Sequence, residues 1–277
     1  MANLITMAGL GKRFSNEGYK IPKALISTSG KPMIHKVIES LPKSDKWVFI
    51  VRQEHIDIFN IDKVIKQVLP NAIITIDKEL SGQASIFCAE KYFEKSEEVF
   101  IAGCDCGFLY NNKKHDKIKL DKNYDFIMWT FSQEQRLRDK PESWGYIVLG
   151  EDKKTITNMS VKIPISKDPY YDHVVTAAFW ISSAKLLFDS VREMMKKEIK
   201  TNGEYYLDNM PLAFNLLHKK STYFDVDLYV GWGTPKELHD YEEYEYYYKF
   251  VGLDKVKGLT EEKQKLWGKY FKKYLKN

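Results

Sequence analysis

The sequence predicts an α/β protein with a Rossmann-like, mixed and mostly parallel central sheet that is flanked by helices. Short apolar runs alternate with helical patterns through the first half of the chain, which is typical of strands joined by crossover helices. A length of 277 residues suffices for one large core, or for one domain with an appendage. The hydrophobic content of 44% and the charged content of 29% are those of a soluble globular protein.

The predicted elements follow one another at regular spacing. Strands are expected at residues 4–7, 47–51, 73–76, 99–102, 126–131, 146–149 and 174–181. Helices are expected at residues 33–41, 61–69, 83–93, 184–197 and 206–217. Because ligands of such sheets bind beyond the carboxyl ends of the strands, the turns that follow residues 7 and 102 are candidates for a site.

The turn after the first strand combines glycines with cations. Gly9 and Gly11 lack the Cβ atoms that would keep a backbone away from phosphate oxygens. Arg13 follows two residues later, and Pro22 stiffens the loop directly before Lys23. Backbone N–H groups of the turn, together with these two cations, can hold and neutralise a polyphosphate. The pattern therefore predicts a triphosphate site.

Two common glycine loops do not fit this turn. The dinucleotide-binding fingerprint needs a third glycine where the chain has Phe14. The Walker loop needs a Gly-Lys-Ser/Thr segment after four spacer residues, and Gly11-Lys12-Arg13 has neither the spacing nor the hydroxyl. The alternative is an ordinary strand-to-helix turn that has surface cations and binds no ligand. The full set of glycines, Arg13 and Pro22-Lys23 favours a ligand site.

This set resembles the signature of a known family. The turn Gly9-x-Gly11-x-Arg13-Phe14 followed by Pro22-Lys23 is similar to that of the nucleotidylyltransferases that activate sugar phosphates and related small phosphates, the NTP-transferase family. The resemblance runs in scattered motifs from Met1 to about Leu238. It implies a glycosyltransferase-A-type fold and Mg²⁺-dependent transfer of NMP from an NTP to a small phosphorylated acceptor, with release of pyrophosphate. The polysaccharide-pathway members further imply a role in surface or capsular precursor synthesis.

The resemblance assigns roles at the nucleotide. Arg13 is expected on the β- and γ-phosphates, where a guanidinium gives two-point contact, and Lys23 on the α-phosphate, where charge builds up. A solvated loop lysine is the alternative for Lys23. The expected nucleotide-binding residues are Ala8, Gly9, Gly11, Lys12, Gly82, Gln83 and Cys104. The Gln83 amide could pair with one edge of a base, and the short segment favours a pyrimidine, from CTP or from UTP or dTTP.

Asp105 is the first candidate for a metal ligand. It follows the strand at residues 99–102, and a carboxylate there can meet Mg²⁺ that is bound to phosphates. Stabilisation of its own turn is the alternative. The family commonly adds a second carboxylate in an Asp-x-Gly-Thr-Pro motif, but this chain has Gly231 at that place. Either one ligand is lost or Asp225 or Asp227 substitutes, and we favour Asp227 because it lies nearer the motif.

The acceptor side is expected in the second half. Trp144 and Gly145 would line it, and Lys162, followed by Ile163-Pro164, partly matches the family's Glu-Lys-Pro lysine that grips the acceptor phosphate. Glu204 resembles the residue that accepts acceptor hydroxyl groups, or is a first-turn helix glutamate. These departures and the aromatic second half favour an acceptor other than glucose phosphate.

The C-terminal residues differ from the rest, so we expect a nucleotidyltransferase domain at 1–238 and an aromatic, basic helical extension at 239–277. Residues 253–277 hold eight lysines and three acidic residues, which accounts for the net charge of +5. The aromatic stripe Trp267, Tyr270, Phe271 and Tyr274 recurs at helical spacing. We expect it to pack on the body or on a second copy in a homodimer; binding to an anionic membrane surface is less favoured.

Other classes of function are excluded or ranked lower. The nearly neutral body lacks the basic face that nucleic-acid binding needs. The chain shows no apolar stretch of membrane-spanning length and no signal pattern, so a cytoplasmic protein is expected. The missing second carboxylate leaves a non-catalytic, nucleotide-binding or regulatory member as an alternative. A glycosyltransferase that uses a nucleotide sugar ranks third, because Cys104-Asp105-Cys106 stands where an Asp-x-Asp motif is normal.

Overall fold

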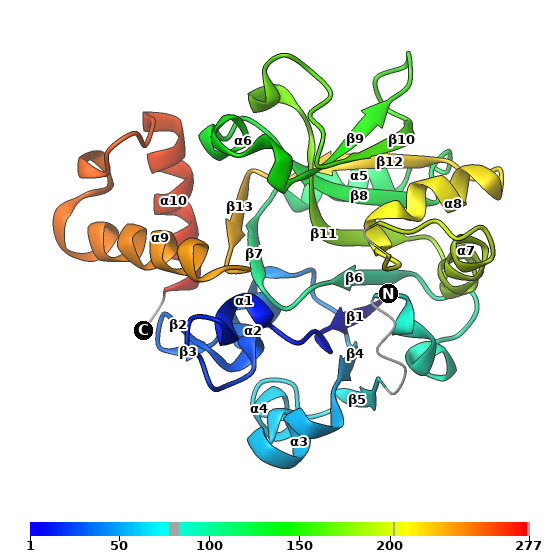
Figure 1. Cartoon of the computed structure of the whole chain (residues 1–277), viewed down its shortest axis with the longest axis horizontal. Helices are drawn as coiled ribbons and strands as arrows, with labels where there is room; N and C mark the ends of the chain where they lie inside the picture. Colours follow the sequence, from blue (N-terminus) through cyan, green and yellow to red (C-terminus); the bar gives the residue numbers. More distant parts are fainter. Residues whose placement is uncertain (78–82, 202, 276–277) are drawn as a thin grey trace.

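The computed structural model describes residues 1–77, 83–201 and 203–275. A nine-stranded sheet in the order β10-β9-β11-β6-β1-β4-β5, with β8 beside β11 and β12 beside β8, crosses the molecule (Figure 1). Its strands are β1 (Ala2–Thr6), β4 (Lys46–Val51), β5 (Ile73–Ile76), β6 (Val99–Ala102), β8 (Phe126–Phe131), β9 (Gly145–Leu149), β10 (Ile156–Val161), β11 (Val174–Ile181) and β12 (Ser221–Asp225). Within the described ranges, all of these except β10 and β11 point the same way, which confirms the predicted mixed, mostly parallel α/β sheet.

Helices cover both faces of this sheet. They are α1 (Lys12–Ser15), α2 (Met33–Ser40), α3 (Gln53–Phe59), α4 (Ile61–Lys66), α5 (Asn112–Lys119), α6 (Gln135–Asp139), α7 (Ala184–Lys196), α8 (Met210–Leu216), α9 (Pro235–Tyr246) and α10 (Glu261–Tyr274). Consecutive strand residues alternate between two apolar clusters: Ile5 packs with α2 and α10, whereas Leu4 packs with α7 and α8. The central strands are therefore buried on both faces. None of the described helices is long and apolar enough to cross a membrane.

Most predicted elements are present, and two differ in kind. The segment expected as a helix at 83–93 is a 3₁₀ helix, η2 (Gln83–Tyr92). The helix expected at 206–217 divides into a 3₁₀ turn, η5 (Leu207–Asn209), and α8. Pro211 explains the division, because proline fits the first turn of a helix and not its interior.

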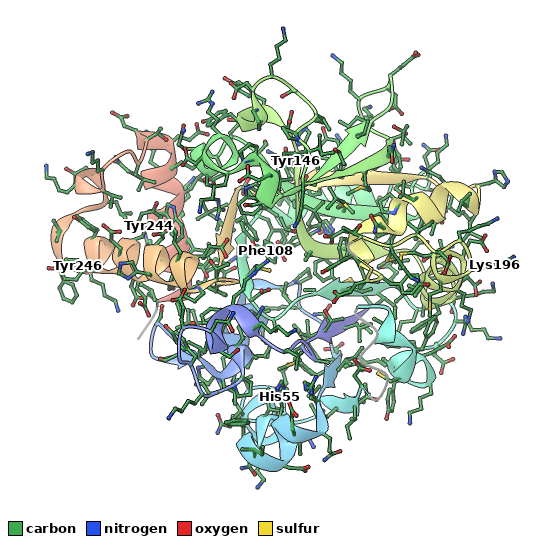
Figure 2. All side chains as sticks on the ribbon, viewed as in Figure 1. His55, Phe108, Tyr146, Lys196, Tyr244 and Tyr246 are labelled. Carbon is green, nitrogen blue, oxygen red and sulfur yellow. The ribbon has the colours of Figure 1, made fainter. Side chains whose placement is uncertain are left out.

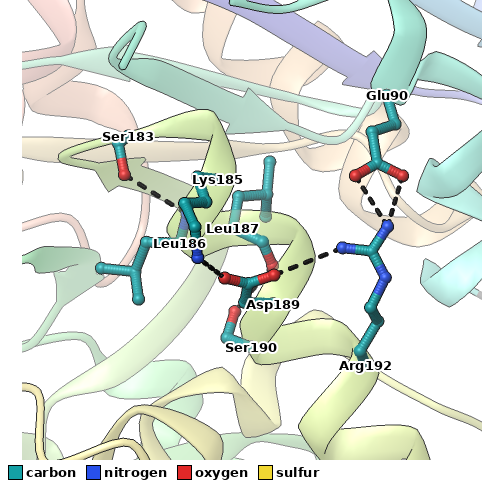
Figure 3. A network of polar contacts seen from close by, with 8 residues as sticks. All are labelled: Glu90, Ser183, Lys185, Leu186, Leu187, Asp189, Ser190 and Arg192. Atoms are coloured by element: carbon teal, nitrogen blue, oxygen red, sulfur yellow. Dashed lines mark hydrogen bonds and ion pairs between the residues drawn. The ribbon is translucent and has the colours of Figure 1, made fainter. Parts of the chain in front are cut away.

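Helix α7 is fastened to η2 by surface charges (Figure 3). Arg192 donates from Nη2 to both carboxylate oxygens of Glu90, at 2.7 and 2.6 Å. Asp189 accepts from Lys185 one turn earlier on the same helix. Ser183 caps the helix by accepting from the Leu186 N–H at 3.3 Å. The ion pair therefore joins α7 to η2, and both elements contribute residues to the second apolar cluster.

The C-terminal extension packs on the body of its own chain. β7 (Cys106–Leu109) and β13 (Leu228–Gly231) form an antiparallel pair, and α9 and α10 lie beside it (Figure 1). The aromatic stripe of α10 belongs to the same apolar cluster as the sheet. A Cβ atom on Gly107 would meet the Trp232 ring at 2.7 Å and the Tyr270 hydroxyl at 2.9 Å, so this close approach requires glycine. The aromatic stripe was expected to pack either on the body or on a second copy, and it packs on the body of its own chain.

Polar contacts tie both helices of the extension to the N-terminal part. Lys36 of α2 is buried and donates to the carbonyl oxygen of Tyr274, in the last turn of α10, at 2.5 Å. Burial lowers the pKa of Lys36. The Ser29 hydroxyl donates to Glu245 of α9 at 2.6 Å. Tyr246, by contrast, projects outward from α9 and is exposed (Figure 2).

We predict that one buried histidine makes the fold sensitive to acid. His115 lies between the rings of Trp129 and Phe224, with centroid distances of 5.2 Å, and burial lowers its pKa to about 4 from 6.5. Between these two pH values His115 binds a proton in the unfolded chain but stays neutral in the folded chain. The free energy of unfolding therefore falls as the pH drops from 6.5 to 4. The loss should approach about 3 kcal/mol, measured by urea unfolding at several pH values.

The control separates this histidine from the general effect of acid. His115→Phe should flatten the dependence of the unfolding free energy on pH in that window. Equal slopes in the wild type and in His115→Phe would show that His115 is not the responsible group.

Candidate active site

The glycine turn is anchored at its end and open in its middle. Gly11 takes the left-handed conformation, with φ 62°, as the residue that begins α1. Phe14 is buried in the core and donates its N–H to the Gly11 carbonyl oxygen at 2.9 Å. Apart from Gly9 itself and its two chain neighbours, no described residue has an atom within 4 Å of the place that a Cβ on Gly9 would take. The exposed backbone at Gly9 is therefore accessible to a ligand.

Lys23 and Asp105 meet beside this turn, as the expected site requires. Lys23 Nζ lies 2.5 Å from Asp105 Oδ2, and the two side chains are 23% and 28% exposed. Asp105 stands between β6 and β7, and β6 is the parallel neighbour of β1. Burial alone would lower the pKa of Lys23, but the Asp105 carboxylate and its hydrogen bond raise it overall. The lysine thus keeps its positive charge at this half-buried position.

Arg13 and Lys12 are exposed on α1. The Arg13 charge acts on Tyr206. The pKa of Tyr206 is raised, first by burial and then by a hydrogen bond with Glu204. Burial also raises the pKa of the nearby Asp208 to about 6. The structure therefore brings the predicted Glu204 segment toward the predicted phosphate-binding arginine.

Three of the four expected acceptor residues, Trp144, Gly145 and Lys162, are adjacent to one another. The Lys162 N–H donates to the Trp144 carbonyl oxygen at 2.8 Å, and Val161 of β10 pairs with Gly145 of β9. Lys162 itself is exposed and has a φ of 63°, which is strained for a residue with a side chain. The edge of the sheet where β9 begins thus carries the Trp144 ring, Gly145 and the Lys162 cation.

Arg136 of α6 adjoins this edge, and the sequence analysis did not single it out. Its guanidinium lies over three rings, 5.0 Å from the centroids of Phe131 and Tyr229 and 5.4 Å from that of Trp144. Its Nη1 is 3.7 Å from Glu237 Oε1. A lone arginine in a short polar helix gave no signal in the sequence, because the three rings come from separate strands and loops.

The turn after β13 closes on Asp105. Gly231 pairs with Cys106, and the Trp232 N–H donates to the Asp105 carbonyl oxygen at 2.8 Å. A Cβ atom on Gly233 would lie 3.0 Å from Asp105 Oδ2. The segment that corresponds to the family's Asp-x-Gly-Thr-Pro motif is therefore at the site, although its carboxylate is missing.

The structure corrects the prediction that Asp227 supplies this carboxylate. In the ladder, Leu228 pairs with Leu109 while Gly231 pairs with Cys106, so Asp227 is at the opposite end of the ribbon. Asp227 lies four positions before Gly231, which corresponds to about 13 Å of extended chain. Asp225 is engaged elsewhere, because it accepts from Thr130 at 2.6 Å and lies 2.8 Å from His173 Nδ1. Asp227 is therefore remote from Asp105, and both carboxylate oxygens of Asp225 already have partners.

Glu237 carries the carboxylate that the sequence analysis missed. Thr234 begins α9, and its hydroxyl lies 3.1 Å from both the Glu237 N–H and Glu237 Oε2. A Cβ atom on Gly231 would lie 2.7 Å from Glu237 Oε1. The signal in the sequence was the Thr-Pro-x-Glu pattern, which indicates a helix cap and a glutamate directed back toward the start of the helix.

Four of the predicted nucleotide contacts have other outcomes. Gly82 lies outside the described residues, and for Gln83 the structure describes the backbone at the start of η2. Ala8 is half-buried against the second apolar cluster. The Cys104 side chain is buried in the core, and burial raises the pKa of its thiol to about 11, so a contact from Cys104 to a nucleotide would have to come from its backbone. That thiol is inert and not presented to a ligand.

The residues present fit a metal that is shared with phosphates better than a self-contained metal site. Within the described ranges, no group of three or more His, Cys, Asp or Glu side chains gathers around one point. Mg²⁺ commonly binds one or two carboxylates and takes its remaining ligands from phosphates and water. Asp105, beside the open glycine turn, matches that requirement.

Known proteins share this architecture. The curated bifunctional protein GlmU of Thermotoga sp. (strain RQ2) is 25% identical to this chain over 210 residues. The match covers 75% of this chain and 43% of that relative, so the chain spans less than half of its length. No protein-family model matches the chain.

Solved structures extend the likeness over nearly the whole chain. The inositol-1-phosphate CTP transferase from T. maritima has a TM-score of 0.66 and 18% identity, and the match covers 91% of this chain and 97% of that one. The nucleoside-diphosphate-sugar pyrophosphorylase from Vibrio cholerae RC9 has the same TM-score and 17% identity, over 87% of this chain and 99% of that one. The fold is that of the nucleotidyltransferases. The comparisons support the NTP-transferase family that the motifs indicate.

We predict that Lys23 and Asp105 are energetically coupled. In a double-mutant cycle of Lys23→Met and Asp105→Asn, chemical unfolding should give a coupling energy of about 1–3 kcal/mol, because each half-buried charge loses its counter-charge in the single variants. The exposed pair Lys236 and Asp240, 2.7 Å apart on α9, is the control and should couple by about 0.3–0.5 kcal/mol. Additive effects at Lys23 and Asp105 would contradict the prediction.

Proposed function

We propose that this protein is a nucleotidyltransferase that moves an NMP group from an NTP to a small phosphorylated acceptor and releases pyrophosphate. The observation that carries the proposal is the Lys23–Asp105 pair, 2.5 Å apart, beside a glycine turn whose middle is open. A cation and a carboxylate brought together from residues 82 positions apart suit a triphosphate with its metal. The exposed Arg13 on the same turn adds the charge that the outer phosphates need.

The proposed reaction needs positioning and charge more than covalent work. An oxygen of the acceptor phosphate forms a bond to the α-phosphorus, and the bond from that phosphorus to the bridging oxygen breaks, with its electron pair leaving on pyrophosphate. Arg13 and Lys12 would hold the β- and γ-phosphates, and Lys23 would neutralise charge at the α-phosphate. When bound, Mg²⁺ supplies further neutralisation of the phosphates, and Asp105 would hold it. A phosphate dianion already is a nucleophile, so no general base is required.

The finer assignment concerns the two substrates. We propose a pyrimidine nucleotide, CTP or UTP or dTTP, on the basis of Gln83 and of the CTP named for the T. maritima structure. We propose an acceptor other than glucose phosphate in surface or capsular polysaccharide synthesis. Its binding site would use Trp144, Gly145, Lys162 and Glu204. The support is the aromatic and cationic edge of β9, together with the changed motifs at positions 161–163 and 231.

A pyrophosphate assay tests the activity and identifies the base. With Mg²⁺, each NTP in turn and a pool of sugar, polyol and other small phosphates, we expect release of pyrophosphate with a pyrimidine nucleotide and only when acceptor is present. Glucose 1-phosphate as the best acceptor would overturn the proposed acceptor class. If no combination of NTP and acceptor releases pyrophosphate, and calorimetry detects no NTP binding, the proposed function is overturned.

Binding tests the role of Arg13 separately. Arg13→Ala should weaken NTP binding by roughly 10- to 100-fold in calorimetry, because it removes charge-assisted hydrogen bonds of about 1.5–3 kcal/mol. Lys20→Ala, which removes an exposed cation near the same turn, should leave the affinity within about twofold. Unchanged binding by Arg13→Ala would remove Arg13 from the site.

A further inference from the structure

We infer that Glu237 is the second carboxylate of the site and holds, together with Asp105, the metal ion that accompanies the nucleotide. The inference rests on the proposed function and deepens it. It assigns to a helix residue the role that the family gives to a strand residue at position 231, where this chain has glycine. Glu237 would therefore contact the cofactor directly, and it is not only a helix cap.

The first observation is that the Glu237 carboxylate occupies the space of the missing side chain. A Cβ atom built on Gly231 would lie 2.7 Å from Glu237 Oε1 and 3.1 Å from the carboxyl carbon. These distances are too short for the two groups to coexist without a shift. With glycine at 231, the Glu237 carboxylate lies where a side chain at that position would begin, so a carboxylate is still present beside the turn.

The second observation places both carboxylates around one point. A Cβ atom on Gly233 would lie 3.0 Å from Asp105 Oδ2 and 3.3 Å from Glu237 Oε2. Glycine at 233 keeps this space free of side-chain atoms, and the Trp232 N–H holds the turn against the Asp105 carbonyl oxygen at 2.8 Å. Two carboxylate oxygens around an open space, beside a phosphate-binding turn, are the donor set that Mg²⁺ accepts in nucleotide sites.

The third observation concerns the charge balance. Asp105 has Lys23 as its counter-charge at 2.5 Å, and Glu237 has Arg136 at 3.7 Å. Two neighbouring carboxylates repel each other, and each cation offsets part of that cost. The 3.7 Å contact of Arg136 is too long for a hydrogen bond, so Glu237 Oε1 remains available to another cation.

Because Glu237 also caps α9, the variant must keep the cap. Glu237→Gln does so, since glutamine serves at the third position of a capping box as glutamate does. Its thermal unfolding should match that of the wild type. Glu243→Gln, an exposed glutamate on the same helix, is the matched control.

The experiment measures the coupling between metal and nucleotide, independently of turnover. Calorimetry gives the dissociation constant of each NTP, including CTP, UTP and dTTP, in EDTA and in Mn²⁺, and the ratio of the two constants reports how much the metal tightens binding. We expect the wild type and Glu243→Gln to share one ratio. In Glu237→Gln the ratio should fall about tenfold or more, with the dissociation constant in EDTA nearly unchanged.

A second variant returns the carboxylate to the strand. Gly231→Asp combined with Glu237→Gln should restore most of the metal-dependent tightening. Gly231→Asp alone should not exceed the wild type, because its Cβ meets the Glu237 carboxylate. A Glu237→Gln protein that keeps the wild-type ratio would overturn the inference and leave the proposed function standing. A wild-type protein that binds none of the nucleotides would overturn both.

Discussion

The Lys23–Asp105 ion pair is the interaction on which the site depends. It joins the loop that follows the glycine turn to the bend after β6, and those two segments meet only because β1 and β6 are parallel neighbours. Parallel strands bring their carboxyl ends to one edge, and loops at that edge form the binding site in open α/β sheets. The pair also sets the charge beside the glycine turn, because the Asp105 carboxylate and its hydrogen bond raise the pKa of the half-buried Lys23.

The C-terminal extension is part of this arrangement and not a separate appendage. α10 buries its aromatic stripe in the core, and Tyr270 approaches β7 so closely that position 107 must be glycine. β7 in turn pairs with β13, which delivers the turn at residues 231–234 to Asp105. Buried aromatic residues of this size stabilise a protein by several kcal/mol each. Packing of the extension therefore holds the turn at residues 231–234 in place beside Asp105.

The sequence predicted the parts of the fold and site that local signals specify. The apolar run at residues 99–102 followed by Asp105, and the glycine turn followed by Lys23, are short patterns whose meeting follows from parallel pairing. Choosing Asp227 failed because nearness in sequence is a poor guide along a strand, where four residues span about 13 Å. Arg136 was missed because its surroundings come from three distant segments.

A carboxylate at the start of a helix is held in position by other contacts than a carboxylate at the end of a strand. An aspartate at 231 would be held by the ladder with Cys106, whereas Glu237 has a longer side chain with more rotamer freedom. The Thr234 hydroxyl and the Arg136 guanidinium restrict that freedom from two sides. Arg136 is itself held over Trp144, at the edge expected to bind the acceptor. With the proposed metal carboxylate on the helix, Arg136 would link the proposed metal side of the site to the expected acceptor side, a connection that a strand aspartate would not need.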